Sequence, residues 1–270
     1  MAYRAQRPLA IYGAWALSLG NSTWSEEATL VMTVLGCGVL CYASARILQD
    51  RGINPSFALA VLVLPGIIAS YRFLMPGALA LGLGVLGMHL WLGNKPRPWL
   101  ATAAFCLAVL ARESMILFPA GLVLSQLAAR RRPSLRLALP LGCYIGWWIA
   151  VRFLVGLPLG VSSSGRRTSA PFVALIDVAN GQWEAPEWAI AVMTILLAAW
   201  AVRTYGNNPW VWTIMGGLVL STVLGPDVWP HWQNFTRSLT PVHFASALLL
   251  LTALRSDVGP RSSVDRASVS

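Results

Sequence analysis

The run PWLATAAFCLAVLARESMILFPAGLVLSQLAA at residues 98–129 decides the fold class. It is apolar except for Arg112-Glu113-Ser114 at its middle, and basic flanks, NKPRP and ARRRPSLR, stand at its two ends. One long helix or a helical hairpin would each suit such a run in a membrane. Because basic residues mark the cytoplasmic ends of spans, two basic flanks favour an even number of crossings. We therefore expect a hairpin with Arg112 and Glu113 at its outward tip and arms of about 14 to 16 residues, short for a full span.

The composition of the whole chain also indicates a membrane protein. Of the 270 residues, 56% are hydrophobic and 11% are charged, and the mean hydropathy is +0.62. Soluble domains carry about 25% charged residues, so this composition excludes a water-soluble fold. The net charge is +10, but the bases lie in short tracts between apolar segments, where retention on the cytoplasmic side explains them. We expect the lipid bilayer as a partner and no nucleic acid.

Apolar segments close to the roughly 20 residues of a membrane span recur along the chain. We predict an all-α, polytopic transmembrane helix bundle with about nine membrane segments plus a short N-terminal apolar helix, Leu9–Gly20, which is re-entrant or interfacial. The nine segments are Ala28–Ile47, Pro55–Tyr71, Pro76–Gly93, Pro98–Ala111, Ser114–Ala129, Leu135–Leu154, Glu187–Val202, Pro209–Gly225 and Ser238–Leu254. Residues 1–255 form a single domain, and residues 256–270 form a polar, disordered cytoplasmic tail.

The orientation follows from the loops that connect these segments. If each segment crosses once, the basic tracts all fall on one side: Arg46 and Arg51, Lys95 and Arg97, Arg130 to Arg132 with Arg136, Arg203, and Arg255. That side is the cytoplasm, which also receives the C-terminus. The residue usage is typical of a GC-rich bacterial genome, so we expect a multi-pass protein of the bacterial inner membrane.

Cysteines and glycines inside the apolar segments are expected to serve packing. Cys37, Cys41, Cys106 and Cys143 form no CxxC pair and have no histidine at metal-ligand spacing, so we expect no metal and identify no cofactor. The glycines at positions 82, 84 and 87 share one segment, where missing side chains let neighbouring helices approach closely. Tryptophans near predicted segment ends, Trp210 and Trp229 among them, are interpreted as an interfacial belt.

Charged residues near membrane depth are costly and usually have a partner or a function. Arg112 and Glu113 at the hairpin tip are candidates to hold an anionic head group and to orient a sugar hydroxyl. The alternative is an ion pair that pins the hairpin. Arg72, in SYRFLMP at an outward helix end, is either a phosphate ligand or a side chain that snorkels to the interface.

Two outward connections carry further candidates. The stretch DVWPHWQNFTRSLTP places Asp227, His231, Trp232 and Arg237 at one membrane edge, where indole faces can stack on sugars and a guanidinium can bind phosphate bidentately. An ordinary interfacial loop is the alternative. The longest outward loop, Gly156–Glu187, is either a binding lid or a connector, and it contains Arg166, Arg167, Asp177, Trp183 and Glu184.

Three stretches of the chain carry a likeness to a known family. The central stretch is LAVLARESMILFPAGLVLSQLAARRRPSLRLALPLGCYIGWWIAVRFLVG, with an Arg-Glu-Ser after a short apolar arm, a basic turn and a helix bearing Trp and Arg. The other two are YRAQRPLAIYGAWALSLGN near the start and WQNFTRSLTP near the end. Together, over roughly residues 3 to 255 in order, they resemble the GT-C type of polytopic membrane glycosyltransferases, especially those of bacterial cell-surface glycopolymer formation.

The resemblance implies a sugar donor linked to a polyprenyl phosphate, transfer to an outer-face glycan or lipid acceptor, and phosphate binding by Arg112, Arg237 and Arg72, with Glu113, His231 and Trp232 in the substrate site. The key acid of that superfamily is usually an Asp in the first outer loop. No acid here matches it, since Glu26 and Glu27 follow the YRAQRP segment instead of preceding it. The catalytic residue is therefore unassigned, and we interpret the chain as an N-terminally truncated or inactive form.

Two other classes of protein fit the same residues. A transporter or flippase subunit would use buried Arg and Glu to line a pathway, and a non-catalytic membrane scaffold would use them for packing alone. A transporter needs polar residues through the midplane, whereas these helices are nearly apolar at their centres. The sequence therefore favours the transferase.

Overall fold

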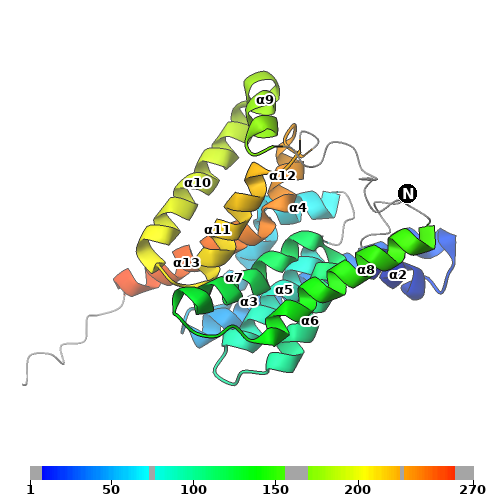
Figure 1. The fold of residues 1–270 in the computed structure, drawn as a ribbon, viewed down its shortest axis with the longest axis horizontal. Coiled ribbons are helices and arrows are strands. Elements are labelled where there is room, and N and C mark those ends of the chain that lie inside the picture. The colour runs from blue at the N-terminus through cyan, green and yellow to red at the C-terminus, as the bar shows by residue number, and fades with distance from the viewer. Residues whose placement is uncertain (1–7, 73–76, 156–169, 226–227, 259–270) are drawn as a thin grey trace, which may run out of the picture.

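A computed structural model describes residues 8–72, 77–155, 170–225 and 228–258, and every regular element in these ranges is a helix (Figure 1). The α-helices are α2 Pro8–Leu17, α3 Ser25–Asp50, α4 Pro65–Arg72, α5 Gly77–Leu92, α6 Pro98–Ala111, α7 Leu117–Ala128, α8 Leu139–Val155, α9 Val173–Gln182, α10 Ala185–Tyr205, α11 Pro209–Thr222, α12 Trp232–Ser238 and α13 Thr240–Val258. Short 3-10 helices are η1 Ser22–Trp24, η2 Pro55–Val63, η3 Glu113–Ile116 and η4 Leu135–Ala138.

The helices meet the length and composition of membrane spans only in part. Three are long and apolar enough to cross a membrane: Glu26–Asp50, Leu135–Leu154 and Ala185–Tyr205. Two bent helix pairs raise the number to five if each pair is one span, and three further apolar helices are shorter than 18 residues. The all-α class is confirmed. Of the nine predicted membrane segments, the structure supports three to five candidate spans.

One predicted segment is bent where a straight helix was expected, and another is preceded by a short helix that was not predicted. Pro55–Tyr71 divides into η2 and α4, which meet at 60°. Leu64 between them has φ −59° and ψ 134°, because a residue that precedes proline is disfavoured in the helical region. The last segment is preceded by α12, which meets α13 at 71° near Pro241.

The boundaries of the predicted tail also change. Helix α13 continues to Val258, so residues 256–258 are helical and not part of a disordered tail. Residues 259–270 lie outside the described residues. The predicted N-terminal apolar helix is present as α2.

The hairpin interpretation of residues 98–129 agrees with the structure. Arg112 has an extended backbone, φ −160° and ψ 125°, that separates α6 from η3 and α7. At the other end, the Arg136 guanidinium lies 4.5 Å from the Trp99 ring centre, and the backbone N–H of Ser134 donates to Gln126 Oε1 at 3.3 Å. Both basic flanks of the run therefore lie at one end of the bundle.

Close helix packing depends on the glycines of α5, as predicted. A Cβ atom on Gly82 would lie 2.9 Å from the Gly36 carbonyl oxygen and 2.9 Å from the Leu40 backbone nitrogen, so α3 and α5 touch through their backbones. A Cβ atom on Gly84 or Gly87 would lie 2.6 Å or less from atoms of the Phe118 or Phe105 ring. The three glycines thus face α3, α7 and α6 respectively.

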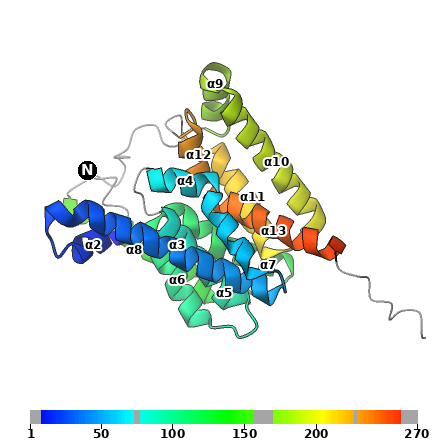
Figure 2. The same ribbon diagram turned by 180° about the vertical axis from the view of Figure 1, so that it is seen from behind.

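Hydrogen bonds gather the basic tracts at one end, which we call the basic end. Asn94 Nδ2 donates to Asp50 Oδ1 at 3.3 Å, and Arg51 Nη1 donates to Thr252 Oγ1 at 2.7 Å. The Tyr205 hydroxyl donates to the Leu249 carbonyl at 2.9 Å, which joins the end of α10 to the middle of α13, and Figure 2 shows this end of α10 beside α13. Helices far apart in sequence therefore end together where the positive charge collects, and we call the opposite side the far end.

Candidate functional site

Arg112 is a buried cation at the far end of the bundle. It caps the C-terminus of α6, and its Nη1 atom lies 3.6 Å from the position that a Cβ atom on Gly77 would take. A Cβ atom on Gly77 would also contact the hydroxyl of Ser70 in α4. The guanidinium thus approaches the start of α5, where the missing side chain of Gly77 makes room for Ser70 of α4. Glu113 follows as the half-buried first residue of η3.

Arg237 lies on α12, which packs closely against α4. A Cβ atom on Gly66 of α4 would lie 2.7 Å from the Thr236 carbonyl oxygen, and it would also contact the Thr240 hydroxyl. Arg237 is half-buried, and its Nη2 donates to Asn234 Oδ1 at 3.3 Å. Arg72 is the exposed last residue of α4. Arg72 and Arg237 therefore lie on two helices that pack together, whereas Arg112 approaches the start of α5, where Ser70 of α4 also lies.

His231 and Trp232 stand at the start of α12, and a buried carboxylate from α10 fixes this point. His231 is exposed, whereas Trp232 is half-buried. Glu187 Oε1 accepts a hydrogen bond from the Trp232 backbone N–H at 3.2 Å. Its Oε2 accepts from the Glu184 N–H at 3.3 Å, as half of a capping box that begins α10. Sequence reasoning did not select Glu187, because its burial depends on a segment 45 residues away.

Aromatic rings form a cluster at the far end, beside the hydrogen bonds of Glu187, which we call the Glu187 clamp. Trp183 lies 5.0 Å from Trp188, 5.9 Å from Trp229 and 5.7 Å from Phe235 between ring centres. Trp183 Nε1 donates to the Trp229 carbonyl at 2.9 Å. Trp188 is exposed, but Trp229 is buried, and so is Trp210 in α11. The belt interpretation is therefore wrong for Trp229 and Trp210, which are core residues.

Arg152 is a second buried arginine at the far end and was not among the predicted site residues. It lies in the last turn of α8, with its guanidinium carbon 4.1 Å from the Trp148 ring centre, in cation–π geometry. The signal was present in the sequence, since an arginine inside an apolar segment needs a partner. Arg112, Glu113, Arg152 and Arg237 all have interaction partners.

Several predicted site residues fall outside the described residues, namely Asp227 and, in the long outward loop, Arg166 and Arg167. The described part of that loop contains α9, on which Asp177 is exposed. Figure 1 shows α9 beside the start of α10, away from the end of α13.

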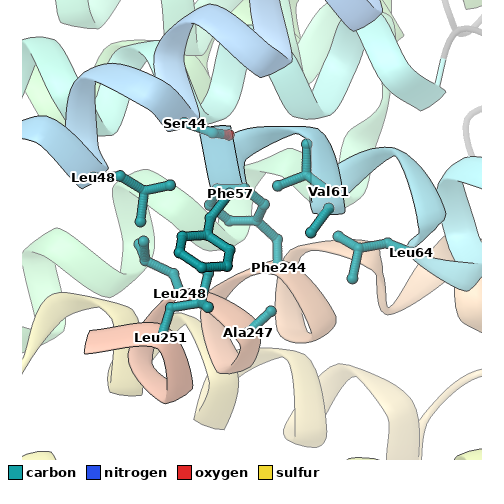
Figure 3. Close-up of a pocket in the computed structure, with 10 residues that line it drawn as sticks. Ser44, Leu48, Phe57, Val61, Leu64, Phe244, Ala247, Leu248 and Leu251 are labelled. Carbon is teal, nitrogen blue, oxygen red and sulfur yellow. The ribbon is translucent and has the colours of Figure 1, made fainter. Parts of the chain in front are cut away.

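Two hollows lie away from these arginines, at or near the basic end. One, of about 200 Å³, is lined by Asp50, Arg51, His89 and Asn94 among others, and His89 Nδ1 lies 3.3 Å from Asp50 Oδ2. Burial lowers the pKa of the Arg51 guanidinium, and nearby Tyr205 raises it, but an arginine stays protonated in proteins. The other, of about 40 Å³, is an apolar groove between α3, η2 and α13 (Figure 3). Neither is lined by Arg72, Arg112 or Arg237.

The far end thus offers guanidiniums, carboxylates and indole rings, which suit binding of an anionic, sugar-bearing ligand. Among the residues that the structure describes, no three His, Cys, Asp or Glu side chains lie close enough to hold a metal ion. No protein-family model matches the sequence, and no curated protein or solved structure matches it either.

Proposed function

We propose that this chain is a multi-pass bacterial inner-membrane protein of the GT-C glycosyltransferase type that holds a polyprenyl-phosphate-linked sugar at its far end. The sugar passes to a glycan or lipid acceptor outside the cytoplasm. The observation that supports this proposal is the packing of α4, which ends in Arg72, against α12, which carries Arg237, while Arg112 approaches the start of α5 beside Ser70 of α4.

The chemistry of arginine is the reason that this placement matters. A guanidinium presents a rigid fork of N–H groups that matches two phosphate oxygens. Arg112 is buried, so its field is screened less than that of a surface charge. Trp232 and His231 begin the helix that carries Arg237, where an aromatic face and an imidazole suit a sugar bound next to the phosphate.

The proposed orientation places the basic end in the cytoplasm, with about nine membrane segments and a cytoplasmic C-terminus. Positive residues are retained on the cytoplasmic side of bacterial membranes. The arginines of the far end then lie at the outer surface, where the head group of an outward-facing polyprenyl phosphate also lies. Helices shorter than a full span accord with a bundle whose interior helices are covered by other helices.

The test is binding of a radiolabelled polyprenyl-phosphate hexose to the purified full chain in nanodiscs. Arg112→Lys keeps the charge but loses the fork, and Arg72→Ala removes an exposed guanidinium that the fold does not need. Loss of one charge-assisted contact costs about 1.5–3 kcal/mol, so we expect Kd to rise roughly 10- to 100-fold in each variant. Arg203→Ala, an exposed arginine in the last turn of α10, is the matched control and should bind like the unaltered chain.

Transfer is measured in the same nanodiscs by the release of the labelled sugar to an added membrane glycolipid extract. Equal affinities in all four proteins would contradict the phosphate role of these arginines. Tight binding without transfer would leave donor binding in place and overturn the enzymatic part.

One observation favours a transporter or flippase as a second candidate. The bent pairs η2–α4 and α12–α13 pack against each other through α4 and α12. Discontinuous helices that meet in this way form the binding sites of many secondary transporters. Movement of a fluorescent polyprenyl-phosphate analogue across proteoliposomes, with no sugar transfer, would favour this second function.

A further inference from the structure

Two helices each carry groove-lining residues and an arginine on one face, with the arginine at the basic end, and we call each such set a stripe. On α3 the stripe is Ser44, Leu48 and Arg51, at spacings of four and three residues. On α13 it is Leu248, Leu251 and Arg255, at spacings of three and four. Residues at these spacings share one helix face, so both stripes run toward the basic end and end in a guanidinium.

The groove-lining residues of the two stripes approach the groove in Figure 3 from opposite sides. Ser44, Leu48 and Leu248 belong to its buried floor, whereas Phe57 and Ala60 of η2 form an exposed rim. The groove measures about 40 Å³, so it receives a short segment of an apolar chain from the side of the bundle. In a membrane this side faces acyl chains.

The two arginines converge where the groove ends. Arg51 Nη1 donates to Thr252 Oγ1, the residue that follows Leu251 of the groove. A Cβ atom on Gly52 would lie 2.5 Å from Arg255 Nη1, so the Arg255 guanidinium rests on the α3–η2 turn next to Arg51. Gly52 has a φ of +63°, which favours glycine, and its missing side chain leaves room for the Arg255 guanidinium.

No carboxylate forms an ion pair with Arg51 or Arg255 among the side chains that the structure describes, which in α13 end at Arg255. Asp50 is adjacent in sequence, but its carboxylate is directed to α5, where it lies 3.3 Å from His89 Nδ1 and accepts from Asn94. Two neighbouring guanidiniums create a positive potential that attracts an anion from outside the protein.

We propose that this groove and the arginines at its end form a binding site for an anionic phospholipid of the leaflet on the basic side. The phosphate binds Arg51 and Arg255 beside the turn at Gly52. A short segment of one acyl chain enters the groove between α3, η2 and α13. Basic pockets between membrane helices on the cytoplasmic side recognise anionic head groups by this combination of charge and shape.

A purely structural role would have a different signature. Cations near a helix C-terminus are also stabilised by the helix dipole, and both arginines stand at such ends. In that case their removal would lower stability equally in every lipid. Only a lipid site requires the groove and the guanidiniums together.

The test is native mass spectrometry of the purified full chain, titrated with phosphatidylglycerol, phosphatidylcholine or inorganic phosphate. We expect selective binding of phosphatidylglycerol, with affinity lowered at least about tenfold by Arg255→Ala, since the charge-assisted contacts to phosphate are lost. Ser44→Leu fills the groove floor without touching either arginine and should weaken binding similarly. Arg46→Ala is the matched control, an exposed arginine on the same helix and at the same end, and should leave affinity unchanged.

Three outcomes would overturn the proposal. Arg46→Ala could lower affinity as much as Arg255→Ala, which would indicate general charge attraction. Phosphatidylcholine could bind as tightly as phosphatidylglycerol, which would indicate an apolar contact alone. Inorganic phosphate could bind as tightly as the lipid, with no effect of Ser44→Leu, which would indicate a site for a free anion.

Discussion

At the scale of single residues, Glu187 links two helices that the sequence separates. Its buried carboxylate accepts the backbone N–H of Trp232 and that of Glu184. Glu187→Ala leaves both donors without this acceptor, and an unsatisfied buried donor costs about 1–3 kcal/mol. We expect a lower thermal unfolding midpoint in detergent, together with faster proteolysis near α12.

The control is Glu26→Ala, which removes an exposed carboxylate from the first turn of α3. If Glu187→Ala and Glu26→Ala shifted the midpoint equally, the clamp on α12 would be discarded. Glu187→Gln keeps an acceptor oxygen and should recover part of the loss.

The residue scale also shows which site residues a sequence can reveal. Arg112 was conspicuous because it interrupts an apolar run, and it is buried in the structure. Glu187 was not, because its partner lies on α12, 45 residues away, and only folding brings them together. Arg152 could have been selected by the same reasoning as Arg112, since it stands in an equally apolar segment.

At the scale of helices, the contact between α3 and α5 depends on the absence of one side chain. A Cβ atom on Gly36 would lie 2.5 Å from the Leu79 Cα atom and 2.9 Å from the Ala78 carbonyl carbon, so the two backbones must separate if residue 36 becomes alanine. Overpacking typically costs 1–3 kcal/mol, and here the obstacle is backbone, which yields little. We expect Gly36→Ala to reduce folded yield and the unfolding midpoint strongly.

Gly38 provides the comparison on the same helix, because a Cβ atom there would meet nothing within 4 Å. Gly38→Ala should be neutral or slightly stabilising, since alanine favours helix. Equal losses in Gly36→Ala and Gly38→Ala would show that α3 and α5 do not pack through Gly36.

Helix boundaries were predictable wherever local chemistry sets them. Proline starts α6 and α11 where the sequence placed the starts of those segments, and the hairpin follows from its basic flanks. The bend before Pro65 was missed because the apolar stretch continues through it, whereas α12 was missed because the polar residues of WQNFTRS were interpreted as part of an outward connection. A proline within an apolar run signals a possible bend, but its angle is set by tertiary packing.

At the scale of the whole molecule, charge is divided between the two ends. The basic tracts meet at the ends of α3, α5, α10 and α13, although they are spread over most of the sequence. The positive-inside rule uses only this division, which is why orientation can be predicted without knowledge of packing. The number of crossings is harder, because helices of 10–17 residues fall short of a span by length alone.

The proposal that the basic end is cytoplasmic is tested most directly by measuring the orientation of α10 in the membrane. The four native cysteines are replaced by alanine, and a single cysteine is placed at exposed Asp177 on α9 or at exposed Thr204 near the end of α10. A membrane-impermeant maleimide is then applied to intact spheroplasts and to inverted vesicles. The account predicts labelling of D177C only in spheroplasts and of T204C only in inverted vesicles. Labelling of both positions from the same side, or the reverse pattern, would contradict it.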